Sequence, residues 1–442
     1  MDKDAYIIKL EEEIGRLKEQ LGCLKEQLAD LMRRLGLNST NSSKPSSMDG
    51  LQKKPRTQST RSKSQKPSGG QKGHKGYHLK QVETPDHIHV HDVPFCKACG
   101  LSLETQPIQT VSKRQVFDIP EPKIEIAEHQ ALTKICTCGC VNQAPFPKEA
   151  TAPACYGKRI QSFTTYLSNQ HFIPLDRLQD VLKDLFEISL STGCIATFNE
   201  RLAKAVTPHQ DQILENLKQA SVKHLDETGF RVGGKTQWLH VISNDSQTHY
   251  RVSAKRKDLN PLEGISGVVV HDHWKSYFKL PGVTHSLCNA HHLRELKALM
   301  EIEKEPWATR MDRLLRCANQ LTSPCYDRIS RLYDQIVQTG LTFHEKEPAF
   351  GKSKRKRRIG HNLLIRLRDY KEDVLRFITT PGVPFTNNQA EQDVRMMKVK
   401  QKISGGFRTQ DGANDFATIR GFLSTQRKQR LNILNAIAAQ LA

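Results

Sequence analysis

The sequence lacks any run of about 18 apolar residues, the length that a membrane-spanning helix requires. Its start, MDKDAYIIKL, also lacks the apolar core of a signal peptide. Both absences exclude a membrane protein, and we expect a soluble chain that stays where it is made. The 11 cysteines are odd in number and unevenly clustered, which argues against a secreted disulfide framework and for reduced thiols.

Acidic residues are scarce relative to basic ones. The chain has 67 Lys and Arg against 47 Asp and Glu, a formal net charge of +20. The excess is clustered, and it favours a polyanionic partner, nucleic acid more than a membrane surface.

The first segment, residues 1–37, has the spacing of a leucine-zipper coiled coil. Apolar residues alternate spacings of three and four, as the a and d positions of a heptad do. This seam comprises Ile7, Leu10, Ile14, Leu17, Leu21, Leu24, Leu28, Leu31 and Leu35. We expect a homo-oligomer, with dimer or trimer left open; the alternative is an amphipathic helix packed on its own chain.

Residues 38–85 form a basic, low-complexity linker. Between Lys53 and Lys80 there are nine Lys or Arg and no acid, so the segment cannot bury a core alone and should be disordered. Its end, SGGQKGHKG, carries Lys72, His74 and Lys75 among glycines, a composition that fits a narrow minor groove. A flexible basic linker without a DNA contact is the alternative.

Residues 86–148 contain two cysteine clusters, CKACG and CTCGC. Such knuckles are typical of a structural, tetrahedral Zn²⁺ site. The expected ligands are Cys96, Cys99, Cys136 and Cys138, with Cys140 as a substitute. Strands are expected between the clusters, at 114–119 and 123–126.

Residues 155–220 have a helical pattern. Leucines from Leu175 to Leu185 form one apolar face, SLSTGC forms a turn, and a second helix is expected from Ile195 to Val206. This arrangement is similar to a helix-turn-helix that reads the major groove. An ordinary helical hairpin has the same pattern.

From residue 222 the pattern changes to strands, VKHLDETGFRV, TQWLHVISN, THYRVSA and GVVVHDH, with a shorter one near 284–287. This order predicts a mixed α/β sheet. A helical stretch follows from 291 to about 379, interrupted by the basic loop KSKRKRR. In that loop we expect phosphate contacts from Arg355, Arg357 and Arg358. The last helices are expected at 388–402 and 415–441.

Carboxylates on three of these elements suggest a divalent-metal site. Asp226 or Glu227 ends the first strand, Asp272 follows the fourth, and Glu391 lies on a helix; spacing does not choose between the first two. Two Mg²⁺ or Mn²⁺ ions held by three acids would suit phosphoryl transfer. Lys398 lies two helical turns after Glu391, where it could hold a phosphate.

A second constellation, Cys288-Asn-Ala-His291-His292-Leu-Arg294, offers Cys and His at metal-ligand spacing. Two ligands do not make a site. We interpret it as packing beside the sheet, with His291 and Arg294 at the mouth of the acid cluster.

Taken together, several motifs of the chain resemble the insertion sequence sixty-six family of bacterial transposases, of the Asp-Asp-Glu class. These motifs are SGGQKGHKG, CKACG with CTCG, LDETGF, HDHWKSYF, CNAHHLREL and TNNQAEQDVRMMKVKQKISGGFRT. The resemblance implies that Asp226, not Glu227, acts with Asp272 and Glu391. It implies metal-dependent cleavage and strand transfer at the element's terminal inverted repeats, with target DNA and small accessory proteins as partners, in the bacterial cytoplasm at the nucleoid.

The resemblance also implies the fold class: multidomain α+β, with a coiled coil, basic linker, zinc finger, helical region and a ribonuclease-H-like α/β catalytic core. That core comprises residues 221–298 and 381–442, separated by an all-helical insertion at 299–380. Gln392, Lys72 and Cys140 depart from the family pattern without removing a metal ligand. The alternatives are a zinc-finger, coiled-coil regulator with an inactive nuclease core, and another ribonuclease-H-like nuclease.

Overall fold

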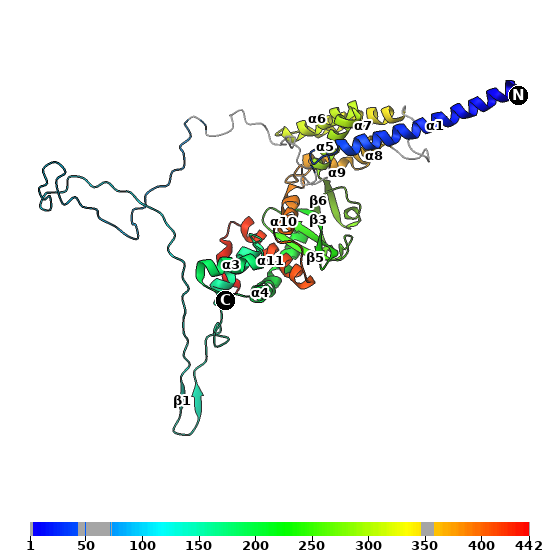
Figure 1. Cartoon of the computed structure of the whole chain (residues 1–442). Helices are drawn as coiled ribbons and strands as arrows, with labels where there is room; N and C mark the ends of the chain where they lie inside the picture. Colours follow the sequence, from blue (N-terminus) through cyan, green and yellow to red (C-terminus); the bar gives the residue numbers. More distant parts are fainter. Residues whose placement is uncertain (1–2, 43–48, 50–70, 72, 346–357, 442) are drawn as a thin grey trace. The chain divides into compact units, whose positions relative to one another are not determined.

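A computed structural model describes residues 3–42, 49, 71, 73–345 and 358–441 (Figure 1). The chain divides into two compact units: residues 62–126 form the smaller one, and residues 1–61 with 127–442 form the larger. The architecture is a mixed α/β one, with a helical N-terminus and a central sheet in the larger unit. None of the described helices is long and apolar enough to cross a membrane.

The larger unit begins with helix α1 (Lys3–Gly36). Its heptad leucines are exposed, from 41% for Leu10 to 86% for Leu35, so the apolar seam has no partner within the described chain. Only the end of the helix is attached to the body, where Arg33 forms an ion pair with Glu303 of the π-helical turn η4 (Leu299–Glu303). The described contacts therefore do not support an amphipathic helix packed along its own chain.

The smaller unit contains no helix or strand among its described residues, apart from a single bridge between Phe95 and Ser102. The strands predicted at 114–119 and 123–126 are wrong. The alternating side chains are there, but Val116 and Ile119 are 91% and 85% exposed because no sheet covers them. The hairpin β1 (Thr133–Ile135) and β2 (Val141–Gln143) belongs to the larger unit.

After α1, three further described helices precede the central sheet: α2 (Lys158–Asn169), α3 (Leu175–Phe186) and α4 (Thr192–Gln219). The predicted helical hairpin is confirmed as α3 and α4, but α4 extends thirteen residues beyond the expected end at Val206. The extension is buried through Ile213 and Leu217, which pack on the central sheet. The helical pattern alone does not reveal this packing, because the sheet that covers the extension comes later in the sequence.

The central sheet has the order β5-β4-β3-β6-β7. The strands are β3 (Val222–Val232), β4 (Lys235–Ser243), β5 (Thr248–Ser253), β6 (Gly267–His271) and β7 (Val283–Leu287). The first three pair antiparallel through short turns, whereas β6 and β7 run parallel to β3. The predicted mixed sheet is confirmed.

Glycine at the start of β6 allows this strand to approach β3 closely. Gly267 has a φ of +76°, and a Cβ there would lie 2.9 Å from the backbone oxygens of Ala220 and Ser221. The next residue, Val268, donates a 2.8 Å hydrogen bond to Ser221 O. A side chain at Gly267 would displace β6 and shift its register on β3.

Five helices follow β7: α5 (Asn289–Ala298), α6 (Pro306–Gln320), α7 (Tyr326–Glu345), α8 (Ile359–Asp369) and α9 (Lys371–Thr379). They bury a core of their own, which includes Trp307, Met311, Tyr333 and Leu364. This separate core explains how a helical segment can be inserted between β7 and the last helices without disrupting the sheet.

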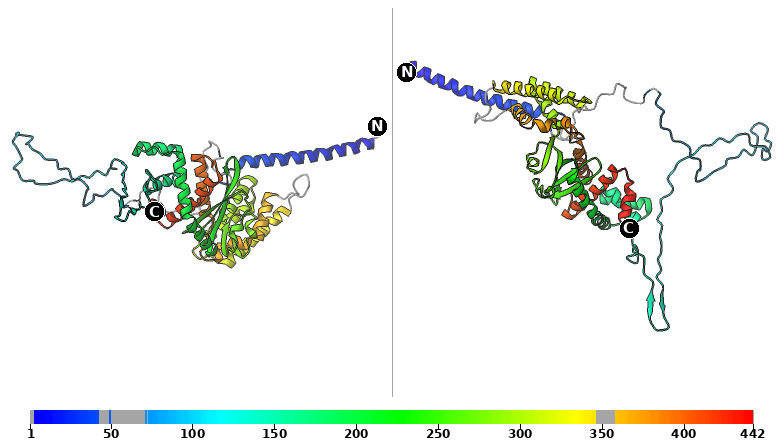
Figure 2. Two further views of the ribbon diagram at one scale, coloured as in Figure 1. Left: turned by 90° about the horizontal axis from the view of Figure 1, so that it is seen from below. Right: turned by 180° about the vertical axis from the view of Figure 1, so that it is seen from behind.

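The chain ends with α10 (Asn388–Ser404), α11 (Gln410–Lys428) and α12 (Ile433–Gln440). Helices α10 and α11 cover one face of β3, β4 and β5 through Val394, Met397 and Phe416, and Figure 2 shows them beside the strands. The prediction of one helix over 415–441 was wrong. The chain breaks at Arg430, whose φ is +60°, and a new helix begins where the Asn432 side chain accepts the N–H of Asn435.

Candidate active site

Three carboxylates converge from three elements. Asp226 lies on β3, Asp272 directly follows β6, and Glu391 is in the first turn of α10. In the parallel pair β3–β6, His224 is opposite Val270; two residues further along, the same register puts Asp226 beside Asp272. The sheet therefore brings together two acids that are 46 residues apart in the sequence.

The acids affect one another electrostatically. Burial raises the pKa of Asp226 well above its ordinary value, and the negative charges of Glu227, Asp272 and Glu391 raise it further. Burial likewise raises the pKa of Asp272, against the hydrogen bond that its Oδ1 accepts from Trp274 N at 2.9 Å. A cation at this place would relieve the repulsion and restore the ionised forms.

Glu227 has partners that Asp226 lacks. Its Oε1 accepts a 2.8 Å hydrogen bond from Arg256 Nε, its Oε2 accepts one from the Tyr277 hydroxyl, and its side chain is 2% exposed. The guanidinium of Arg256 also lies over the Trp274 ring, 4.6 Å from its centroid. These contacts support Asp226 as the metal ligand and give Glu227 the role of holding Arg256.

Glu391 has a different set of neighbours. Its Oε1 lies 3.8 Å from His291 Nδ1, 3.9 Å from Arg294 Nη2 and 3.9 Å from Cys288 Sγ. Within the described parts of the chain, the ligand atoms of Cys288, His291 and Glu391 all lie within 4.8 Å of one another. The Cys-x2-His pair thus lies at the acid cluster, as the sequence suggested.

The protonation of Cys288 and His291 in the absence of a metal bears on which metal this second group suits. Burial and the charge of Glu391 raise the pKa of Cys288 to about 12, so its sulfur stays a thiol. Burial and the charge of Arg294 lower the pKa of His291 to about 3, so its ring is neutral at pH 7. Soft metals need a thiolate, and the carboxylate oxygens therefore form the better ligand set, one suited to a hard cation.

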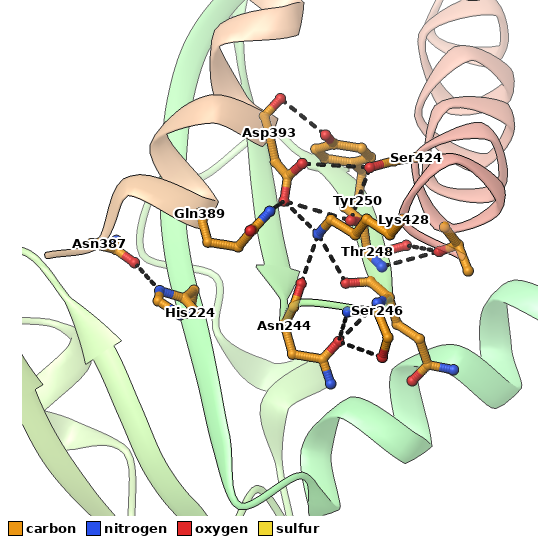
Figure 3. A network of polar contacts seen from close by, with 12 residues as sticks. His224, Asn244, Ser246, Thr248, Tyr250, Asn387, Gln389, Asp393, Ser424 and Lys428 are labelled. Carbon is orange, nitrogen blue, oxygen red and sulfur yellow. Dashed lines mark hydrogen bonds and ion pairs between the residues drawn. The ribbon is translucent and has the colours of Figure 1, made fainter. Parts of the chain in front are cut away.

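Asn387 joins the parts that carry the acids, and the sequence analysis did not single it out. Its side chain is bonded to Leu225 on β3 and to His224 Nδ1 at 2.8 Å (Figure 3), and its backbone N–H points to Cys288 Sγ at 3.1 Å. Its place four residues before Glu391, in the motif TNNQAE, was the available signal.

Lys398 lies on α10 as expected, but its Nζ donates to the backbone oxygen of Gly229 on β3. Arg256 also lies beside the acids, and its positive charge opposes the rise that burial causes in the pKa of Asp272. No sequence pattern indicated Arg256, because it lies in a loop 30 residues from Asp226.

The two cysteine knuckles lie in different units of the chain. At the first, the Cys99 and Ala98 backbone N–H groups lower the pKa of the Cys96 thiol; at the second, the Cys138 backbone N–H does so for Cys136. Glycines with positive φ, Gly100 and Gly139, follow in the two turns. Both turns thus favour thiolates, the form that binds zinc.

The structure describes only part of the predicted DNA-binding set. Lys72, Arg355 and Arg357 lie outside the described residues. His74 and Lys75 are exposed, and Arg358 is half-buried at the start of α8.

A mixed sheet that presents one acid within β3 and a second directly after β6, with a third acid on a packed helix, defines a candidate metal-dependent phosphoryl-transfer site. The chain belongs to the transposase IS66 family, whose profile matches residues 154–415, more than half of the chain. Residues 3–80 match a second profile, a family of unknown function, DUF6444.

Among curated proteins, the chain is similar to the uncharacterized protein y4jO of Sinorhizobium fredii (strain NBRC 101917 / NGR234). The two are 33% identical over 79 residues, which is 18% of this chain and 25% of that protein. The match therefore covers a quarter of the relative's length. It adds a second likeness to the family match and no functional description.

Proposed function

We propose that this protein is a DNA transposase that binds the terminal inverted repeats of its own insertion sequence and catalyses cleavage and strand transfer there. The observation that carries the proposal is the convergence of Asp226, Asp272 and Glu391, whose charges together raise the pKa of Asp226. Membership of the transposase IS66 family supports it. The mixed sheet of order β5-β4-β3-β6-β7 is compatible with the ribonuclease-H-like core that is part of this proposal.

Divalent metal ions, Mg²⁺ or Mn²⁺, suit this site. The donors are carboxylate oxygens, which hard cations prefer, and they are partly buried and mutually repelling. Asp226, Asp272 and Glu391 would hold two ions, which when bound supply the Lewis acidity that activates an attacking oxygen and relieves charge on the phosphate.

The surrounding residues prepare the site for DNA. Arg256 is fixed by Glu227 and by the Trp274 ring, so its guanidinium is positioned beside the acids before substrate binds. Arg294 Nη2 lies 3.9 Å from Glu391 Oε1. Both can contact phosphate oxygens. Lys398, whose Nζ donates to Gly229 O on β3, would hold a phosphate near the metals.

The remaining segments would deliver and align the DNA. We propose a structural Zn²⁺ bound by Cys96, Cys99, Cys136 and Cys138, a basic linker that contacts DNA through Lys72, His74 and Lys75, and a loop that does so through Arg355, Arg357 and Arg358. The exposed seam of α1 supports self-association. The domain boundaries predicted from the sequence, and the involvement of small accessory proteins, are part of the same proposal.

A strand-transfer assay tests the function. Labelled DNA carrying the element's terminal repeats is incubated with Mg²⁺ or Mn²⁺ and a supercoiled target. We expect joined product from the wild type and from Asp245→Asn, an exposed control on the β4–β5 turn, and none from Asp272→Asn. Nicking without joining would favour a different nuclease, and tight binding without cleavage, with accessory proteins supplied, would favour a DNA-binding regulator.

A further inference from the structure

A polar cleft lies between α10 and α11, beside the helix face that carries Glu391. It encloses about 450 Å³ and is lined by Gln389, Gln392, Asp393, Arg395, Met396, Arg420, Ser424, Arg427 and Lys428. Four of these side chains are cationic and one is acidic. Such a lining suits an anionic ligand of nucleotide size.

The floor of the cleft is a neutral polar network. Asp393 Oδ2 pairs with Lys428 Nζ at 2.9 Å and accepts a hydrogen bond from Gln389 at 3.1 Å, as Figure 3 shows. Lys428 also donates to the backbone oxygens of Asn244 and Gln247. The negative charge of Asp393 is therefore already balanced by Lys428, and the positive charges of the three arginines remain.

Those arginines retain unused donors. Arg420 is 5% exposed and stacks on Phe172, and its Nε has no hydrogen-bond partner within the described residues. Arg395 and Arg427 are exposed at the rim, and neither forms an ion pair in the described part of the chain. The Arg420 guanidinium also donates from Nη1 to Gln170 Oε1 and its Nε is buried, so Arg420 contributes mainly its positive charge at the base of the cleft. The donors exposed to a phosphate are those of Arg395 and Arg427.

The position of the cleft relates it to the acid cluster. On α10, Gln392, Arg395 and Met396 share one face by their i, i+3 and i+4 spacing. Glu391 precedes Gln392, so its side chain is turned by about 100° around the same helix. A polyanion that reaches the acids can continue along α10 into the cleft.

We propose that this cleft binds the sugar–phosphate backbone of DNA next to the phosphate being cleaved, with Arg395 and Arg427 on consecutive phosphates and Arg420 at the base of the cleft. The proposal rests on the proposed function for its substrate. A single small anion would not occupy all three guanidinium groups, whereas a run of phosphodiesters would. The glutamine amides and Met396 provide sequence-tolerant contacts to the sugars.

Salt-dependent binding tests the proposal without requiring catalysis. The full chain binds a 30-base-pair duplex of arbitrary sequence, with EDTA present, between 50 and 200 mM salt (about the range over which counterion release is usually followed). The variant is Arg395→Gln with Arg427→Gln. The control, Arg310→Gln with Arg313→Gln, removes the same charge from exposed positions of α6.

Each lost phosphate contact lowers the slope of log K against log salt by about 0.9. For the cleft variant we expect the magnitude of the slope of log K against log salt to fall by about two, and DNA binding at 0.1 M salt to be at least about tenfold weaker. The control should stay close to wild type. Equal slopes for both double variants would overturn the proposal. Unchanged melting temperatures show that both fold, as substitutions of exposed arginines should permit.

Protection from phenylglyoxal, which modifies free arginine, provides a second readout. We expect the same duplex to protect Arg395 and Arg427 but not Arg310 and Arg313. If the duplex does not protect Arg395 and Arg427 while the protein still carries out strand transfer, the proposal that the cleft binds DNA is wrong and the transposase proposal stands. If the duplex protects both arginines but the protein does not cleave DNA, the proposal that the cleft binds DNA stands and the transposase proposal is wrong.

Discussion

Asn387 donates a 2.8 Å hydrogen bond from its side-chain amide to the backbone oxygen of Leu225, the residue before Asp226. The Asn387 side chain is 1% exposed, and it directly precedes the helix that carries Glu391. One amide thus fixes the distance between the strand of the first acid and the helix of the third. We propose a positioning role for Asn387, because its side chain bonds to Leu225 O and His224 Nδ1 and not to the carboxylates.

Replacing Asn387 with alanine should separate catalysis from binding. Leu225 O and His224 Nδ1 would lose their partner, which should lower the free energy of unfolding by about 2 kcal/mol. A misplacement of about 1 Å at the acids should lower the cleavage rate roughly 100-fold, while the affinity for DNA stays the same. Denaturant unfolding and single-turnover cleavage measure the two effects. Asn388→Ala, at an exposed neighbouring position, should change neither.

Asp226 and Glu227 should respond differently to loss of charge. Asp226→Asn removes a metal ligand and should abolish metal-dependent cleavage. Glu227→Gln releases Arg256 and Tyr277, and it should weaken cleavage by about tenfold and lower stability by about 1–3 kcal/mol. Cleavage by the two variants under saturating Mn²⁺ distinguishes them. Full activity in Asp226→Asn would transfer the ligand role to Glu227.

The sequence predicted the sheet well, because β3, β4 and β5 alternate apolar and polar side chains and β6 is apolar throughout. It failed where the same alternation has no sheet to join, as at 114–119. Alternation shows which apolar side chains would be buried in a sheet. Whether a neighbouring strand is present to bury them depends on the whole fold.

The candidate site was predictable in its acids and not in its surroundings. Asp272 directly follows its strand as expected, but the expectation that Asp226 or Glu227 ends the first strand was wrong, because β3 continues to Val232. The two acids differ in their contact with Arg256, which reaches Glu227 from 29 residues away. Asn387 acts across 162 residues. The break at Arg430 was a missed local signal, since Asn432 is a favourable N-cap residue.

Zinc content should depend on particular cysteines. We expect Cys96→Ser to lose bound zinc, because the first knuckle has only two thiols, whereas Cys140→Ser should keep about one ion per chain. Metal analysis after dialysis measures this, with Cys155→Ser, an exposed cysteine outside the knuckles, as the control. If Cys140→Ser loses zinc and Cys138→Ser retains it, then Cys140 is the ligand and Cys138 is not.

Self-association should depend on the seam of α1. Asparagine at Leu17 and Leu24, which are 53% and 62% exposed in the single chain, places two amides in an apolar interface and should reduce the oligomer to monomers. The control is Glu12→Asn with Glu19→Asn, on the outer face of the same helix. Sedimentation equilibrium gives the mass, and an unchanged mass in the leucine variant would contradict the coiled coil.

His249 on β5 predicts how stability responds to acid. Burial lowers its pKa to about 4, and its Nδ1 contacts the backbone oxygen of Gln210 at 3.2 Å. The charged groups that act on it are Asp211, which opposes the shift, and Arg251 and Lys218, which add to it. The folded protein therefore holds His249 neutral at a pH where the unfolded chain protonates it.

Because the unfolded histidine has a pKa of about 6.5, the unfolded state binds more protons below that value. The stability that His249 contributes is complete above pH 6.5 and is lost as the pH falls toward 4, by up to about 3 kcal/mol. His249→Gln should remove this loss, so its free energy of unfolding should fall less between pH 7 and about 4 than that of the wild type. His209→Gln, at an exposed position of α4, should follow the wild type. Parallel pH profiles for the wild type and His249→Gln would show that this imidazole is protonated in the folded protein.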